Sequence, residues 1–280
     1  MLEFAKGHGT RNDFVLVTDA DDARPLTDEE VRFLTDRRAG IGGDGILRAV
    51  RGRHIPEWDG DPDVWFMDYR NADASIAEMC GNGVRVFARY LVEEGLVPEG
   101  TTEIPIGTRA GLRAAALLDD GRVRVWMGRP ATADAGTTVQ VGDSSWDATN
   151  VDVGNPHAVV LLGDGDELAA LDLTRAPSWF PLDAFPTGAN VEFVEPVGTN
   201  HVRMRVFERG VGETESCGTG TVAVASAAAR AQGETDGHWV VDVPGGQVEV
   251  DLAQGEAWLT GPAEIVARGT VVLPAEEMDD

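Results

Sequence analysis

The sequence predicts an α+β fold of two pseudo-symmetric lobes, each a mostly antiparallel sheet or barrel wrapped around a central helix. The first observation is a repeated motif: Glu78–Gly83 (E-M-C-G-N-G) and Glu215–Gly220 (E-S-C-G-T-G) are offset by 137 residues, and each leads into an apolar helical stretch. The second observation is that short strand-like segments surround both stretches in the sequence. The chain therefore reads as two related halves.

In the first half, apolar runs at 14–17 and 64–67 predict strands. Thr27 and Glu30 form a capping-box pattern, which predicts a helix that ends near residue 35. After Cys80, a helix is expected to run to a stop at Gly95, because apolar residues recur there at helical spacing. These residues are Val84, Phe87, Ala88 and Leu91.

In the second half, apolar and polar residues alternate over 202–206, which predicts a strand. The segment 219–231 is composed of small residues that are apolar nearly all round, so we expect a helix that is buried on most sides. Further strands are expected at 122–126, 139–141, 151–153, 158–162, 240–243, 248–250, 257–259 and 271–273.

The expected domain division follows from the repeat. Residues 1–128, completed by 262–280, form an N-terminal lobe that carries Cys80, and residues 129–261 form a C-terminal lobe that carries Cys217. Two such lobes are expected to meet at a cleft, where small-molecule sites usually lie.

Composition narrows the class of protein. Hydrophobic residues make up 42% of the 280, but no apolar run is long enough for a membrane span, and the first residues lack the pattern of an export signal. A cytoplasmic protein without membrane contact is therefore expected.

The net charge is −25, and only one of the 23 basic residues is a lysine, Lys6. Such a chain repels nucleic acid, which requires clustered basic residues. The excess of carboxylates also suggests a halophilic-type surface adapted to high salt, where self-repulsion is screened. The alternative is a compositional preference for arginine over lysine.

Motifs for cofactors and metals are missing. Lys6 is the only residue that could form a Schiff base with pyridoxal phosphate, and no phosphate-binding motif accompanies it. The segment 40–45 (G-I-G-G-D-G) lacks the nucleotide fingerprints and reads as a tight turn, and the five histidines show no metal-ligand spacing. We therefore expect neither a cofactor nor a metal.

Cys80 and Cys217 are the candidate catalytic residues. A thiol at a helix start meets unpaired backbone N–H groups and the positive end of the helix dipole, which favour a thiolate and also form an anion pocket. Two such thiols suggest two proton-transfer groups around one carboxylate, one acting as base and the other as acid.

Eight short motifs together resemble the diaminopimelate epimerase family, over most of the chain. They are Lys6–Phe14, Gly40–Asp44, Asn71–Asp73, Cys80–Gly83, Gly154–His157, Asn190–Val191, Glu208–Gly210 and Cys217–Gly220. The resemblance implies an isomerase that interconverts LL- and meso-2,6-diaminopimelate by thiolate/thiol proton transfer, without cofactor, in lysine and peptidoglycan-precursor biosynthesis. A homodimer is suggested by the resemblance alone.

The same resemblance implies roles for individual residues. Asn12, Asn71, Asn155 and Asn190 would hydrogen-bond the unreacting end of the substrate, and Arg209 would pair with its distal carboxylate. Independently of the resemblance, the backbone donors at the two helix starts are expected to clamp the reacting carboxylate. Glu208 and His157 would lie near the amines and thiols, as supporting groups. The full substrate-binding set is Asn12, Asn71, Gly81, Asn82, Asn155, Asn190, Glu208, Arg209, Gly218 and Thr219.

One position departs from the family pattern, because Gly45 stands where the family often has glutamine. Two alternatives to this function stay open. A proline or hydroxyproline racemase-type enzyme shares the two-cysteine design, and a binding protein could use the two thiols as a redox switch. Arg209 and the four asparagines favour a longer substrate with a second polar end, and the lack of C-x-x-C spacing disfavours the switch.

Overall fold

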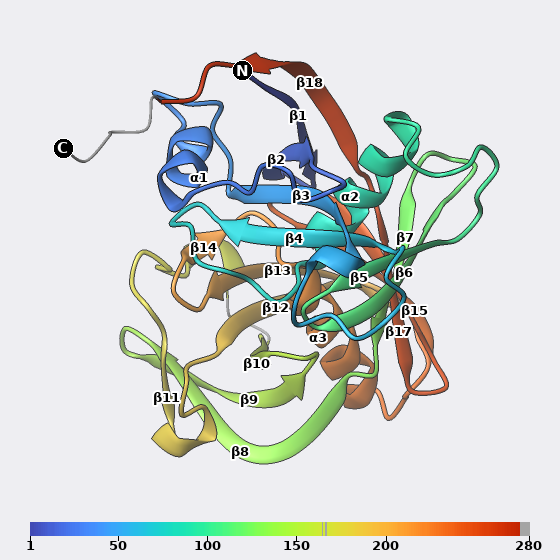
Figure 1. The fold of residues 1–280 in the computed structure, drawn as a ribbon. Helices are drawn as coiled ribbons and strands as arrows, with labels where there is room; N and C mark the ends of the chain where they lie inside the picture. The colour runs from blue at the N-terminus through green and yellow to red at the C-terminus, as the bar shows by residue number, and fades with distance from the viewer. Residues whose placement is uncertain (164, 166, 275–280) are drawn as a thin grey trace. The chain divides into compact units, whose positions relative to one another are not determined.

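The computed structural model describes residues 1–163, 165 and 167–274, and its described chain forms two compact units (Figure 1). Unit 1 comprises Met1–Val123 and the C-terminal segment that begins at Pro262, and unit 2 comprises Arg124–Gly261. The first junction lies a few residues before the expected one at 128, because the strand from Val123 to Gly128 pairs with the last strand of unit 2.

Unit 1 contains the first six strands of the chain, its last strand and two α-helices. Its helices are α1 (Asp28–Thr35) and α2 (Gly81–Glu93), with a short 3-10 helix, η1 (Gly52–His54). Its strands are β1 (Leu2–Gly9), β2 (Asn12–Thr18), β3 (Gly45–Arg51), β4 (Trp65–Asn71), β5 (Ile104–Thr108), β6 (Gly111–Leu117) and β18 (Glu264–Val271).

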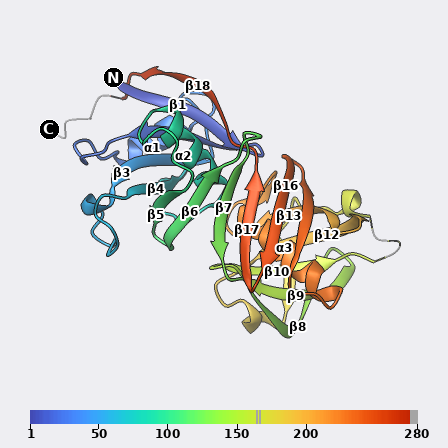
Figure 2. The ribbon, with the colours of Figure 1, turned by 90° about the vertical axis from the view of Figure 1, so that its right-hand side faces the viewer.

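Unit 2 is built around one α-helix, α3 (Gly218–Ala231), with the 3-10 helices η2 (Leu168–Ala170) and η3 (Leu182–Ala184) (Figure 2). Strand β7 (Val123–Gly128) leads into it. The remaining strands are β8 (Ala131–Val141), β9 (Ser144–Asp152), β10 (Pro156–Leu161), β11 (Ser178–Phe180), β12 (Asn190–Gly198), β13 (His201–Glu208), β14 (Gly212–Thr214), β15 (Gly237–Val243), β16 (Gly246–Ala253) and β17 (Glu256–Gly261).

The two units repeat one order of strand pairing. In unit 1, β18–β1 and β1–β2 are antiparallel, β2–β3 parallel, β3–β4 antiparallel, β4–β5 parallel and β5–β6 antiparallel. In unit 2, β8–β9, β9–β10, β10–β12, β12–β13, β13–β15 and β15–β16 follow the same sequence of directions. The long helix of each unit lies at the same point of this order, after β4 in one and after β13 in the other.

Each long helix lies against its own sheet from several sides. Helix α2 contacts β1, β2, β3, β5, β6 and β18, and α3 contacts β9, β10, β12, β15, β16 and β17. Only one side of α2 reaches the surface, whereas the first twelve residues of α3 are all buried. Small side chains such as Ala223, Ala225 and Ala227 let strands approach α3 from all sides, as predicted for a helix that is apolar all round.

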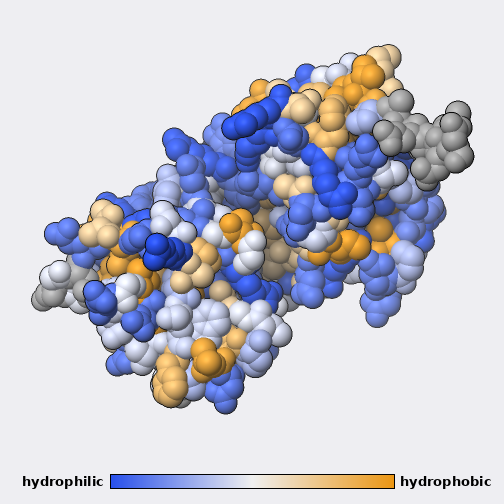
Figure 3. All heavy atoms as spheres, turned by 90° about the vertical axis from the view of Figure 1, so that its left-hand side faces the viewer, coloured by the Kyte–Doolittle hydropathy of each residue, from blue (hydrophilic) through white to orange (hydrophobic). Residues whose placement is uncertain are grey.

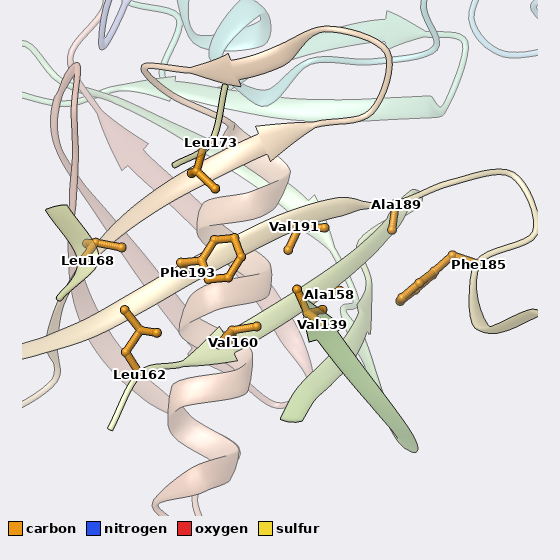
Figure 4. Packing of buried hydrophobic residues seen from close by; sticks show 10 residues of the cluster. All are labelled: Val139, Ala158, Val160, Leu162, Leu168, Leu173, Phe185, Ala189, Val191 and Phe193. Carbon is orange, nitrogen blue, oxygen red and sulfur yellow. The ribbon is translucent and has the colours of Figure 1, made fainter. Parts of the chain in front are cut away.

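Unit 2 has a further core between its sheet and the segment that joins β10 to β12. Phe193 on β12 is fully buried in this core and lies near Leu162 and Val160 in Figure 4. Leu168 and Leu173 come from the connecting segment itself. This packing fixes the start of β12, where candidate site residues lie.

The local predictions fare unevenly. The capping box at Thr27 and Glu30 is formed, both helices after the cysteines are present, and Gly95 follows the cap of α2 with φ of +67°. The strand expected at 271–273 is wrong, because β18 ends at Val271 where its pairing with Leu2 ends. Strands β1, β3, β5, β6, β11, β12 and β14 were not predicted, and β18 was predicted only at Val271.

The surface is mostly polar. On the face shown in Figure 3, hydrophilic residues predominate and hydrophobic residues form small separate groups. Among the described residues, no helix is both long enough and apolar enough to cross a bilayer.

Candidate active site

The first candidate site residues lie at the start of α2, where Cys80 is the N-cap residue. Its backbone is extended, and its Sγ accepts a hydrogen bond from the Gly83 N–H at 3.4 Å. That N–H is one of the helix-start donors that have no partner within the helix. The sequence therefore places a half-buried thiol against the positive end of a helix dipole, as expected from the motif.

Asn12 lies beside Cys80, at the start of β2. Its Oδ1 accepts a hydrogen bond from the Cys80 Sγ at 3.5 Å and another from the Asn82 Nδ2 at 3.2 Å. Its Nδ2 donates to the Asp44 Oδ2 at 2.7 Å. Asn12, Asn82 and Gly81 are thus gathered at the thiol of unit 1.

Asp44 belongs to a cluster of charges that holds the 40–44 turn against β2. Arg37 donates to both Asp13 and Asp44, and Lys6 pairs with Asp13. Burial would raise the pKa of Asp13, but the hydrogen bonds from Arg37 and Lys6 outweigh it and hold that pKa far below its ordinary value. The lone lysine of the chain therefore has a structural partner.

Asn71 and Gly45 face each other across β3 and β4. The Asn71 side chain donates to the Ser75 Oγ at 2.9 Å, so this amide closes a turn in the described structure. A Cβ at Gly45 would lie 2.5 Å from the Arg70 carbonyl oxygen and 2.7 Å from the Tyr69 ring. At the position that departs from the family pattern, any side chain would therefore require the neighbouring backbone to shift.

The same arrangement is repeated in unit 2, at the start of α3. Cys217 is the N-cap, its backbone is also extended, and its Sγ accepts from the Gly220 N–H at 3.4 Å. The Thr219 Oγ1 lies 3.5 Å from the same sulfur. Gly218 and Thr219 are buried with it.

The two thiols differ in their surroundings. Cys217 is buried, and burial raises the pKa of its thiol well above the ordinary value; the negative charges of Glu208 and Glu192 add to the rise. Burial also raises the pKa of Glu208, although hydrogen bonds from Thr214 and Cys217 oppose it. The surroundings of Cys217 therefore favour a protonated sulfur.

His157 and Glu192 form a buried pair beneath α3. The His157 Nδ1 lies 2.7 Å from the Glu192 Oε1, its Nε2 lies 3.0 Å from the Asn155 Oδ1, and both residues are fully buried. A Cβ at Gly220 would lie 2.6 Å from the same Glu192 oxygen, which shows how closely the carboxylate approaches the helix start.

The sequence analysis missed Glu192. Its one available signal is an acidic residue inside the apolar run from Val191 to Val194.

Arg209 and Asn190 lie at the end of β13 and the start of β12. The Asn190 Oδ1 accepts from the Arg209 backbone N–H at 2.9 Å, and the Arg209 Nη1 donates to the Thr187 carbonyl and hydroxyl oxygens. Gly188 has φ of +85°, and a Cβ there would lie 2.9 Å from the Arg209 side chain. Among the described residues, the exposed Arg209 has no carboxylate partner.

Strand register makes the site residues of the two units equivalent. Phe14 pairs with Gly45 as His157 pairs with Asn190, so Asn12 corresponds to Asn155 and Gly45 to Asn190. The same register relates Asn71 to Glu208 and Leu47 to Glu192. Unit 1 therefore carries phenylalanine and leucine where unit 2 carries the His157–Glu192 pair.

Within the described residues, no group of three or more histidine, cysteine, aspartate and glutamate side chains is arranged to hold a metal ion. Neither Cys80 nor Cys217 forms a disulfide.

Comparison with known proteins identifies the family. The sequence model described as "Diaminopimelate epimerase" matches residues 4–133 and 149–271. The chain belongs to the diaminopimelate epimerase family. The diaminopimelate epimerase of Streptomyces coelicolor is 50% identical over 277 residues, covering 96% of this chain and 94% of that protein. That of Corynebacterium glutamicum is 49% identical over 278 residues, covering 97% of this chain and 99% of that protein.

Solved structures show the same fold at much lower identity. A probable proline racemase from Agrobacterium radiobacter is 15% identical with a TM-score of 0.70, covering 99% of this chain and 94% of that one. A predicted epimerase from Pseudomonas aeruginosa is 12% identical with a TM-score of 0.68, covering 98% of this chain and all of that one. The predicted family, fold class and isomerase class of enzyme are confirmed.

Proposed function

We propose that this member of the diaminopimelate epimerase family interconverts LL- and meso-2,6-diaminopimelate with Cys80 and Cys217 as its two proton-transfer groups. One observation supports the assignment of these residues. Each of the two units, which share one order of strand pairing, has a cysteine at the N-cap of its long helix, and the sulfur accepts a hydrogen bond at 3.4 Å from the backbone N–H three residues later. The reaction belongs to lysine biosynthesis.

The chemistry requires two groups that act on opposite faces of one α-carbon. A thiolate removes the α-proton and becomes a thiol, while the other thiol donates its proton to the opposite face and becomes a thiolate. No net proton is consumed, and the protonation states of the sulfurs are exchanged. The enzyme resets when the two thiols exchange protons with solvent or when it runs the reverse reaction.

Stabilisation of the carbanion is assigned to the helix starts. The N–H groups at the beginning of α2 and α3 are directed away from their own helices, and they favour the negative charge that develops on the substrate carboxylate. Gly81, Asn82, Gly218 and Thr219 are the residues proposed for this contact. Gly83 and Gly220 are engaged instead by the sulfurs.

The distal end of the substrate is assigned to Arg209. Its guanidinium donates to Thr187 and has no carboxylate partner among the described residues. It can therefore bind a substrate carboxylate by donating two parallel hydrogen bonds. Asn12, Asn71, Asn155 and Asn190 are proposed to hydrogen-bond the unreacting amino-acid end. Asn12 and Asn71 must exchange present hydrogen bonds, to Asp44 and Ser75, for those to the substrate.

Glu208 and His157 are proposed as supporting groups of unit 2. The Glu208 carboxylate accepts a hydrogen bond from Thr214 and is suited to accept another from a substrate ammonium group. His157 is held on both ring nitrogens, which fixes its orientation beneath the thiol.

The test follows the α-proton by proton NMR while LL-diaminopimelate is incubated with reduced protein in D₂O at high salt. Loss of the α-proton signal with appearance of the meso isomer is expected for the wild type and not for Cys80→Ser or Cys217→Ser. Loss of the signal with proline or hydroxyproline instead would assign the racemase-type alternative. Full activity in either serine variant would refute the two-thiol assignment.

The proposal includes a cytoplasmic location and a homodimer. A reducing compartment keeps both thiols free, which the proton-transfer chemistry requires. Light scattering coupled to size-exclusion chromatography tests the homodimer, since a mass near 29.8 kDa would indicate a monomer.

A further inference from the structure

The turn between β1 and β2 has an unfavourable sequence for its shape. Gly9 pairs with Asn12, so the loop consists of Thr10 and Arg11, whose φ angles are +51° and +64°. Such two-residue loops favour glycine or asparagine, because a side chain crowds the backbone at positive φ and a β-branched one does so most. Among the described residues, Thr10 is the only β-branched residue with φ in this range. The turn therefore needs support from outside the hairpin.

Arg85 on α2 supplies a contact of this kind. Its side chain is fully buried, and its Nη2 donates to the Thr10 Oγ1 at 3.1 Å. The same hydroxyl donates to the Gly9 carbonyl oxygen at 2.7 Å. A Cβ at Gly9 would lie 3.0 Å from the Arg85 Nη2 and 3.3 Å from the Asn82 carbonyl oxygen. The tip of the hairpin therefore packs directly on the first turns of α2.

The contacts of Arg85 lead to Asn12 by two routes. Along the chain, Asn12 is the first residue after the turn that Arg85 binds. Through side chains, the Arg85 Nη2 also donates to the Asn82 Oδ1 at 3.0 Å, and the Asn82 Nδ2 donates to the Asn12 Oδ1 at 3.2 Å. The Asn12 Oδ1 is also the acceptor of the Cys80 Sγ. Arg85 thus fixes both the backbone and the side chain of a residue at the candidate site.

A contribution to stability alone does not account for Arg85. Both of its acceptors are neutral, and its Nε and Nη1 have no hydrogen-bond partner within the part of the chain that the structure describes. Burial of a partly unsatisfied cation is unfavourable, and an apolar side chain of similar length would avoid that cost. The guanidinium is therefore better explained by the geometry that it imposes.

Unit 2 reaches the equivalent geometry without an arginine. The strand register equates Asn12 with Asn155, and the residue before Asn155 is Gly154, with φ of +92°. Glycine adopts this conformation without strain, so its turn needs no support from the helix. By the 137-residue offset, Arg85 corresponds to Val222, which is buried and apolar. The arginine is therefore present in the unit whose turn lacks glycine and absent from the unit whose turn contains it.

We propose that Arg85 is a positioning residue, which holds the Thr10–Arg11 turn in its left-handed conformation and thereby sets the amide of Asn12 for the substrate. The inference rests on the proposed function, in which Asn12 hydrogen-bonds the substrate. Arg85 does not touch the substrate or the reacting atoms in this account. It acts through Thr10 and Asn82.

Hydrogen–deuterium exchange followed by mass spectrometry tests the turn without substrate, in peptides that cover residues 7–16. Arg85→Met should speed exchange there by about tenfold, the size expected for loss of a hydrogen bond from a charged group. Arg11→Gly in the Arg85→Met protein should return exchange to near the wild-type rate, because glycine favours the turn by itself. Faster exchange in Arg85→Met that Arg11→Gly leaves unchanged would overturn the inference.

A second pair of variants covers the case in which Arg85→Met does not fold. Thr10→Val removes the hydroxyl that Arg85 binds and should speed exchange as Arg85→Met does, whereas Thr10→Ser keeps the hydroxyl and should exchange like the wild type. Arg89→Met is the matched control for the helix, because Arg89 lies on the next turn and binds the carbonyls of Gly121 and Ala263. Wild-type exchange in Thr10→Val would contradict the proposed support of the turn.

The proton NMR assay tests the consequence for Asn12. Arg85→Met should lower kcat/KM by about tenfold or more, since small misplacements of a substrate contact are costly, and Arg11→Gly should restore most of it. In an Asn12→Ala background, Arg85→Met should lower kcat/KM little further, which a general loss of stability would not produce. An equal loss with and without Asn12 would refute the positioning role. Exchange is measured without substrate, so failure of the proposed function would be seen separately, as an inactive wild type.

Discussion

Two equivalent glycines, Gly83 and Gly220, should respond to alanine in opposite ways. Both are the third residue of their helix, and both donate the N–H that binds the cysteine sulfur. A Cβ at Gly83 would meet its neighbours at 3.4 Å or more, which is ordinary contact. A Cβ at Gly220 would lie 2.6 Å from the Glu192 Oε1 and 3.3 Å from the Cys217 Sγ.

The magnitudes follow from these contacts. Gly83→Ala should stabilise the protein by up to about 0.5–1 kcal/mol, because alanine loses less conformational entropy in a helix. Gly220→Ala gains the same helix propensity, but its Cβ displaces the Glu192 carboxylate, whose Oε1 is hydrogen-bonded to the His157 Nδ1 at 2.7 Å. Loss of a hydrogen bond to a charged group costs about 1.5–3 kcal/mol, so the two variants should differ by roughly that amount.

Urea denaturation followed by circular dichroism compares the wild type with both variants in one buffer. We expect Gly83→Ala at or above the wild-type midpoint and Gly220→Ala clearly below it. The double variant Gly220→Ala with Glu192→Gln tests the cause, since a neutral amide in place of the carboxylate should reduce the penalty of the alanine. A Gly220→Ala protein as stable as Gly83→Ala would refute the assignment of a tight carboxylate at the start of α3.

Other predictions follow from unit 1 and from the composition. Asp13→Asn should destabilise the protein by about 1–3 kcal/mol at pH 7. Because the pKa of Asp13 is lowered by folding, its contribution is complete at neutral pH and is lost in acid. The difference from wild type in urea midpoint should therefore shrink as the pH falls below about 4. Gly45→Ala should lower the thermal midpoint, because its Cβ would meet the Arg70 carbonyl at 2.5 Å; an unchanged midpoint would contradict that contact. If the charge of −25 reflects salt adaptation, unfolding should require more heat in about 2 M salt than in dilute buffer, and the reverse order would reject it.

The sequence predicts the helices best, because their signals are local. The capping box of α1 and the motif before each long helix are readable from neighbouring residues alone. Strand β3 was not predicted because Arg48 interrupts its apolar run. Arg48 is nevertheless buried, because its ion-pair partners come from distant parts of the sequence. Arg48 is paired with Asp19, Asp22 and Asp68, three carboxylates that the sequence does not connect to it.

The residues of the candidate site likewise fall into those that local sequence reveals and those that only the tertiary structure reveals. Cys80 and Cys217 stand out because the motif is duplicated. Glu192 looks like an ordinary charged residue of a charged chain, and only the tertiary fold places it against His157 and the start of α3. The equivalence of Asn12 with Asn155 also needs the strand register, because the spacing of these residues differs from the 137-residue offset of the cysteines.

In both units, the donor that holds the sulfur is a main-chain N–H. No side-chain substitution can delete such a group, except by proline, so the contact to sulfur persists however the neighbouring positions vary. The side chains at 82 and 219, asparagine in one unit and threonine in the other, are then free to adapt to whatever lies beside the thiol. The side chains at the two helix starts can therefore differ between the units while both thiols stay anchored.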